Sequence, residues 1–119
     1  MIHEAYVSFE IAKLLKEKGF DWKTQYVYTE DGTGSMPPKI GKWKAKSNIP
    51  KATHQMTCAW LREKGVYMSI DTVISSSGNI YFNIDTYSED SGWNHPVDFY
   101  DSYEDAIEAA IEYSLENLI

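Results

Sequence analysis

The alternation of apolar and polar residues is most regular over residues 66–87, VYMSIDTVISSSGNIYFNIDTY. A period of two is typical of a half-buried antiparallel strand, because successive side chains point to opposite faces of a sheet. Two such stretches flank residues 75–79, where Gly78 and Asn79 readily adopt the positive φ of a tight turn. The pattern therefore predicts a β-hairpin over residues 66–87 as the centre of the fold.

The register of this hairpin follows if Ser75 lies opposite Asn79. A slip of one residue would move the isoleucines into water, so the register should be strongly specified. The apolar face, which we expect to form the core, then comprises Met68, Ile70, Thr72, Ile74, Ile80, Phe82, Ile84 and Thr86. The other face carries Tyr67, Tyr81 and Tyr87, and if no helix covers it, it is the best place to look for a binding partner.

Three further segments show apolar residues at helical spacing. The first begins after Ser8 and stops at Gly19, the second begins at Thr53 and stops at Gly65, and the third begins after Ser102. A strand is expected around residues 24–29, while residues 35–51 are irregular, apart from a short edge strand that residues 39–46 could form. We predict an α+β fold, a single domain over residues 1–119, with an antiparallel sheet built on the central hairpin and packed against three helices, the last of which covers the hairpin.

Length and composition bound the class of protein. A chain of 119 residues has room for one core, and its single cysteine, Cys58, excludes an internal disulfide. The N-terminal residues lack the pattern of a signal peptide, and no apolar run is long enough to cross a membrane. We therefore expect a cytoplasmic protein without membrane association.

Charge is distributed unevenly along the chain. Residues 1–64 hold all eleven Lys and Arg with seven acids, a net charge of +4, whereas residues 65–119 hold eleven acids and neither Lys nor Arg, a net charge of −11. The two halves either attract each other or attract separate partners, and the sequence leaves this open.

A basic segment, Lys39–Lys51, is one candidate binding site. Lys42, Trp43 and Lys44 lie at its centre, and no acid occurs between residues 32 and 62. Cations neutralise phosphates and an exposed indole can stack on a base, so this segment could bind single-stranded nucleic acid. A solvated loop that faces the acidic half of the chain explains the same residues, and the acidic protein as a whole repels nucleic acid.

Candidates for catalysis or metal binding are weak. Cys58 lies four residues after His54 on one helix, but cysteine nucleophiles normally take their histidine from a distant segment. Asp71 and Asp85 lie diagonally on the polar face of the hairpin, where wet-face carboxylates are ordinary. His95 with Asp98 and Asp101 fits no standard ligand spacing. We predict no catalytic residue, no metal and no cofactor.

Glutamates at four-residue spacing, Glu104, Glu108, Glu112 and Glu116, form a row on the last helix. Together with Asp98 and Asp101, this row could form a surface for a basic partner, although a solvated helix face is the simpler interpretation.

Three helical segments also carry a family resemblance: VSFEIAKLLKEKGF, PKATHQMTCAWLREKG and SYEDAIEAAIEYSLENLI. With these blocks in this order, the chain resembles a family of small uncharacterised proteins from gut Bacteroidetes and their phages or mobile elements. The chain departs from the family pattern in the PKAT stretch, where the proline lies further from Thr53 than expected. The resemblance implies a shared fold and a phage- or mobile-element-related accessory role in the bacterial cytoplasm. The family has no assigned activity, so it assigns no functional residues.

Taken together, these observations predict a non-catalytic protein that binds another macromolecule, most simply a protein. Single-stranded nucleic-acid binding through Lys39–Lys51 is the first alternative, and a small hydrolase built on the hairpin acids or on Cys58 and His54 is the second. An exposed strand edge beside the hairpin would also allow two subunits to pair, so the oligomeric state stays open.

Overall fold

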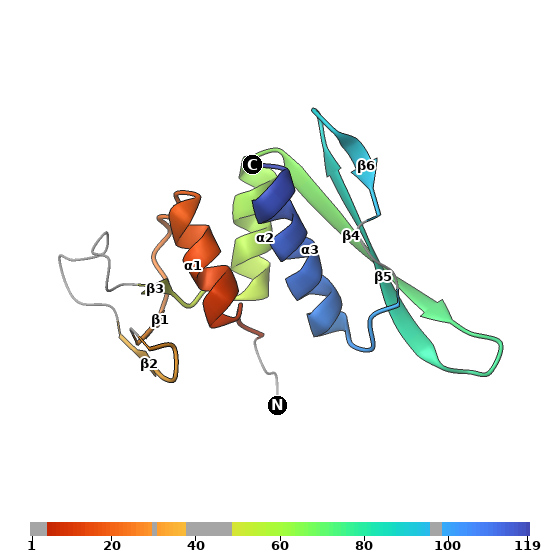
Figure 1. Ribbon diagram of the computed structural model, residues 1–119, viewed down its shortest axis with the longest axis horizontal. Helices are drawn as coiled ribbons and strands as arrows, with labels where there is room; N and C mark the ends of the chain where they lie inside the picture. The colour runs from red at the N-terminus through yellow and green to blue at the C-terminus, as the bar shows by residue number, and fades with distance from the viewer. Residues whose placement is uncertain (1–4, 30, 38–48, 96–98) are drawn as a thin grey trace. The chain divides into compact units, whose positions relative to one another are not determined.

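The computed structural model describes residues 5–29, 31–37, 49–95 and 99–119. These residues form three helices and two antiparallel three-stranded sheets, which confirms the α+β class (Figure 1). The chain divides into two compact units, Met1–Thr57 and Cys58–Ile119, and each is described by itself.

Helix α1 (Phe9–Glu17) belongs to the first unit and has the predicted ends. The Ser8 side chain accepts a hydrogen bond from the Ile11 backbone N–H at 3.3 Å, as a helix N-cap should. Gly19 follows the helix with a φ of 92°, a conformation that glycine adopts without steric cost. The predicted apolar stripe is confirmed, since Ile11, Ala12 and Leu15 are buried.

A small sheet in the order β2–β1–β3 completes the first unit. Its strands are β1 (Val27–Tyr28), β2 (Ser35–Met36) and β3 (Ile49–Pro50). Only β1 was expected from the sequence, and it belongs to this sheet rather than to the hairpin. β3 includes a proline and lies at an edge, where a missing N–H is tolerated. The edge strand expected over residues 39–46 lies outside the described residues.

The turn between β1 and β2 is organised by the Asp31 carboxylate. It accepts hydrogen bonds from the Thr29 hydroxyl at 2.7 Å, the Thr33 hydroxyl at 2.8 Å and the Thr33 N–H at 3.1 Å. These bonds favour the charged form and lower the pKa of Asp31 to about 2. Gly32, with a φ of 77°, lies so close to Phe9 that a Cβ there would be 2.5 Å from its ring.

Helix α2 (His54–Glu63) spans the boundary between the units in the sequence. The Thr53 hydroxyl accepts a hydrogen bond from the Met56 N–H at 3.0 Å, so the predicted start of this helix is confirmed. Trp60 and Leu61 are buried, and Gly65 ends the helix with a φ of 84°.

The second unit contains the hairpin, with β4 (Val66–Ile74) and β5 (Ile80–Ser88) in the predicted register. Ile70 pairs with Ile84, Tyr67 with Tyr87, and all nine pairs continue without a bulge. The Ser75 N–H donates to the Asn79 carbonyl at 2.9 Å and closes the turn.

A third strand, β6 (Gly92–Asn94), extends the sheet in the order β4–β5–β6 and was not predicted. The Ser91 N–H donates to the Ser88 hydroxyl at 3.2 Å in the connecting turn, and Gly92 takes a φ of 69°. β6 then places Trp93 opposite Tyr87.

Helix α3 (Tyr103–Asn117) packs on β4 and β5, which confirms that the last helix covers the hairpin (Figure 1). Its N-cap is Ser102, whose hydroxyl accepts from the Asp105 N–H at 3.0 Å. Ile84, Ala106 and Ala110 form the buried centre of this packing, and the side chains that pack around them are Met68, Ile70, Phe82, Tyr100 and Ala109.

One expectation about the apolar face was wrong. Ile74 and Ile80 pair as predicted but are 67% and 54% exposed. The helix begins at Tyr103, whose ring packs edge-on against Phe82 with centroids 5.9 Å apart. The two isoleucines lie beyond Phe82 toward the turn, so the hairpin extends past its helical cover.

No helix among the described residues has the length and apolar character needed to cross a membrane.

Candidate functional site

The face of the β4–β5–β6 sheet that points away from the α3 core is called here the outer face. Strand alternation places on it Tyr67, Ser69, Asp71, Val73, Tyr81, Asn83, Asp85, Tyr87 and Trp93. Tyr67 and Trp93 are 47% and 63% exposed, so this face is open to solvent around them. It contains all three tyrosines that the sequence indicated as binding residues.

An aromatic row crosses all three strands at one end of the outer face. It consists of Tyr67, Tyr87 and Trp93. The Tyr67 and Tyr87 ring centroids lie 6.4 Å apart, and those of Tyr87 and Trp93 lie 5.2 Å apart. The row follows directly from the register, which sets one aromatic residue of each strand opposite the next.

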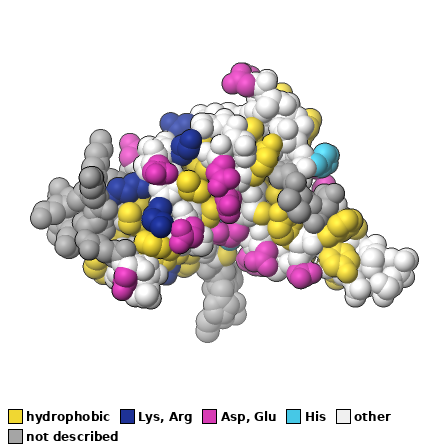
Figure 2. Space-filling view, in the orientation of Figure 1, with side chains coloured by type: hydrophobic (Ala, Val, Ile, Leu, Met, Phe, Trp, Pro, Cys, Tyr) yellow, Lys and Arg dark blue, Asp and Glu magenta, His cyan; other side chains and the backbone are white. Residues whose placement is uncertain are grey.

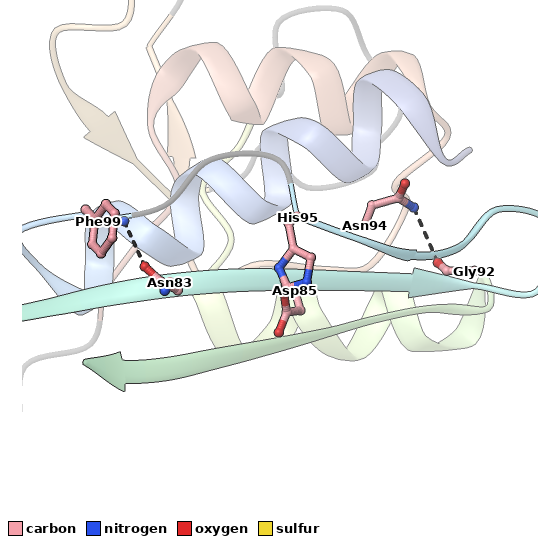
Figure 3. Close-up of polar contacts among 6 residues, drawn as sticks. All are labelled: Asn83, Asp85, Gly92, Asn94, His95 and Phe99. Carbon is pink, nitrogen blue, oxygen red and sulfur yellow. Dashed lines mark hydrogen bonds and ion pairs between the residues drawn. The ribbon is translucent and has the colours of Figure 1, made fainter. Parts of the chain in front are cut away.

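A second aromatic pair lies nearer the hairpin turn. Tyr81 packs edge-on against Phe99, with ring centroids 5.8 Å apart, so Tyr81 shares the outer face with the row but contacts a different ring. Phe99 is 62% exposed and adopts a φ of 68°, a left-handed conformation that costs a non-glycine residue about 1 kcal/mol. The Asn83 side-chain oxygen accepts the Phe99 N–H at 2.8 Å and helps hold this conformation (Figure 3).

Between the two aromatic groups, His95 forms an ion pair with Asp85 when the imidazole is protonated. Figure 3 shows the His95 ring lying over the Asp85 side chain of β5. The contact joins His95 Nδ1 to Asp85 Oδ1. The sequence had suggested His95 as a candidate metal ligand and Asp85 as a candidate catalytic carboxylate. Asp98, the expected companion of His95, lies outside the described residues, and the residues that are described contain no group of three metal-ligating side chains.

The outer face belongs to the acidic part of the chain. Residues 65–119 carry no Lys or Arg, and Asp71 is exposed on the outer face itself. In the view of Figure 2, the visible Lys and Arg side chains lie over the left part of the molecule together with several acidic ones, whereas the right part shows Asp and Glu side chains and one histidine. The surface therefore combines exposed aromatic rings with a negative potential.

Most of the basic segment lies outside the described residues. Lys42, Trp43 and Lys44 lie outside the described residues. Lys51, at the end of that segment, is described, and its ammonium group lies 4.8 Å from the ring centroid of Tyr6 and 5.5 Å from that of Tyr28. Because both cation–π contacts are made within the first unit, Lys51 contributes to the packing of that unit.

The geometry of the predicted hydrolase candidates does not favour catalysis. The Cys58 thiol lies 3.5 Å from the Met68 sulfur, and burial raises its pKa although the charge of Arg62 acts in the opposite direction. A cysteine nucleophile needs the thiolate, so this environment works against it. Asp71 and Asp85 lie diagonally in the sheet as predicted, facing Asn83 and Ser69 respectively, and Asp85 is engaged by His95.

Sequence reasoning missed two of the exposed aromatic residues, Trp93 and Phe99. The stretch SEDSG before Trp93 is a turn followed by an aromatic residue, which is a usable hairpin signal. Phe99 offers no such signal, because its left-handed backbone depends on a hydrogen bond to a residue sixteen positions away.

No protein-family model, curated protein or solved structure matches this chain. The chemistry of the outer face is therefore the basis for assigning a function to this protein.

Proposed function

We propose that this protein is a non-catalytic binding protein that recognises another protein through its outer face. The observation that carries the proposal is the aromatic row of Tyr67, Tyr87 and Trp93 on the side of the sheet opposite the α3 core. Tyr and Trp are the residues most enriched among the energetically dominant positions of protein interfaces.

Packing of the hydrophobic core does not explain why these three rings lie on the outer face. The core that holds the sheet lies on its other face, around Ile84, Ala106 and Ala110. Exposed aromatic rings gathered in one row are typical of an interaction surface, whereas single exposed apolar residues need no explanation. Phe99 supports this argument, because an exposed ring is maintained there despite a strained backbone.

The charge of this surface selects the kind of partner. A protein with basic residues gains from the negative potential around the outer face, whereas a nucleic acid is repelled by it. Arginine and lysine also bind favourably over tyrosine and tryptophan rings. The resemblance seen in the sequence implies a partner in a bacterial cytoplasm, and we propose on that basis that the chain acts as an accessory protein of a phage or mobile element.

The test compares proteins captured from a bacterial lysate at low salt by three forms of the chain. These are the natural protein, a Tyr67→Ser/Trp93→Ser variant of the outer face, and a Tyr26→Ser control in the first unit. Tyr26 is exposed and lies outside the aromatic row, so it controls for loss of a surface tyrosine.

The proposal predicts a protein captured by the natural chain and by the Tyr26→Ser control but lost with the double variant. Because the attraction is partly electrostatic, the affinity of that protein should fall as salt increases. Capture that survives the double substitution, or that is insensitive to salt, would argue against the outer face as the binding surface.

A further inference from the structure

We infer that the partner docks by adding a strand to the edge of β4, as an extended segment in which apolar and basic residues alternate. This inference rests on the proposed protein-binding function and specifies how and what the surface binds. It is carried by the backbone of β4, by the side chains beside its edge and by the charge of the unit.

The backbone groups of alternate β4 residues point away from the sheet. Phe82 exchanges both of its backbone hydrogen bonds with Tyr100, at 2.9 and 2.8 Å, so it has none left for Thr72, its partner on β4. In an antiparallel pair, bonded and non-bonded residue pairs alternate along the strands. The outward N–H and C=O groups therefore belong to Thr72 and, at steps of two, to Met68, Ile70 and Ile74.

On its side away from β5, β4 has no strand neighbour among the described residues, because the sheet order is β4–β5–β6. Proteins usually protect such edges with lysine, proline, a bulge or a very short strand. β4 has none of these, since its nine residues contain neither Lys nor Pro and pair continuously with β5.

The side chains beside the β4 edge determine which residues the added strand of the partner should carry. On the core side the exposed Ile74 continues the partly buried Met68 and Ile70, so an added strand gains by placing apolar residues there. On the outer side Asp71 and Tyr67 favour lysine or arginine, the first by charge and the second by a cation–π contact. Successive side chains of the added strand meet these two environments in turn.

A second copy of the chain is the other possible occupant of this edge. It would bring a net charge of −7 toward an equally negative protein, with eleven of its acids in residues 65–119. Like charges placed together oppose association, so charge complementarity favours a basic segment of a different protein.

The test uses a nine-residue peptide of alternating valine and lysine, blocked at both ends, and the full ¹⁵N-labelled chain. Hydrogen exchange measured by NMR should show the amides of Met68, Ile70, Thr72 and Ile74 exchanging about tenfold more slowly at a peptide concentration ten times Kd. A peptide of the same composition with its valines and lysines in two blocks is the control, and it should bind more weakly and protect none of these amides.

A backbone substitution gives an independent readout. Thr72→Pro removes one outward N–H without breaking a β4–β5 bond, and should weaken binding of the alternating peptide at least tenfold. Thr72→Ala keeps the N–H and should bind like the natural protein. If Thr72→Pro does not fold, the exchange pattern of the natural chain decides the question.

Three outcomes would overturn the inference. In the first, the alternating peptide binds while the four amides stay unprotected. In the second, the block peptide binds equally well. In the third, the four amides become protected as the free protein is concentrated and the peptide adds nothing, which would assign the edge to a second copy.

Failure here is distinguishable from failure of the proposed function. A captured protein that depends on Tyr67 and Trp93 but ignores Thr72→Pro would leave the binding function standing and remove strand addition. If the peptide protects the edge amides but no protein is captured from the lysate, strand addition would stand and the proposed binding function would fail.

Discussion

Tyr87 and Trp93 face each other across the β5–β6 strand pair, with ring centroids 5.2 Å apart. Tyr67 continues the row on the other side of Tyr87, so one aromatic residue from every strand of the sheet contributes to a single exposed surface. Strand pairing thus converts three residues that are distant in sequence into one apolar strip in an acidic surrounding.

Removing Trp93 should change stability little. Because the side chain is largely exposed and contacts one ring, Trp93→Ala should lower the free energy of unfolding by no more than about 1 kcal/mol. Urea denaturation measures this, with Trp60→Ala as the matched control. Trp60 is 1% exposed, and its loss should cost about 3–5 kcal/mol. Equal losses in the two variants would mean that Trp93 belongs to the core.

Two isoleucines on one face of β5 should respond oppositely to a charge. Ile84→Asp places a carboxylate in the α3 packing and should leave the protein unfolded, since Ile84 is fully buried. Ile80→Asp, on the same face but beyond the helix, should fold with a near-natural circular dichroism spectrum. A folded Ile84→Asp protein, or an unfolded Ile80→Asp protein, would contradict the packing described here.

Thr86 offers a stabilising substitution. Its hydroxyl oxygen is buried and has no hydrogen-bond partner within the described part of the chain, a state that costs free energy. Thr86→Val should therefore leave the melting temperature unchanged or raise it. Thr57→Val is the contrast, because the buried Thr57 hydroxyl donates to the Thr53 carbonyl at 2.9 Å, and losing that bond should cost about 1 kcal/mol. The prediction is wrong if both variants are destabilised alike.

Acid should weaken the β1–β2 turn over a defined pH window. The folded pKa of Asp31 is about 2, below the ordinary value of 3.8, so its contribution to stability is complete above pH 3.8 and lost as the pH falls toward 2. Asp31→Asn should therefore reduce the loss of stability between about pH 4 and 2 in denaturant titrations. An NMR titration that places the Asp31 carboxyl near its ordinary pKa would remove the basis of this prediction.

The hairpin register could be predicted because it depends on local sequence. Alternation fixes which side chains share a face, and the residues of the turn fix which pairs are opposite, so Ile70 and Ile84 were correctly matched. The same local information placed the helix ends, where Ser8 and Ser102 accept hydrogen bonds from the first turns.

Local sequence could not predict the exposure of Ile74 and Ile80 or the presence of the third strand, β6. Whether Ile74 and Ile80 are covered depends on where α3 begins, a property of tertiary packing that alternation does not encode. β6 has three residues, too few to show a period of two, and its pairing depends on the preceding turn. Among the predicted binding residues, Tyr67 and Tyr87 are brought together because both lie within the hairpin register.

The most direct test of the outer face is the affinity of the captured protein for the natural chain and for Trp93→Ala. Since an interface hot spot is worth about 2 kcal/mol or more, Kd should rise by roughly 30-fold or more while the variant remains folded. An unchanged Kd in a folded Trp93→Ala protein would contradict the account.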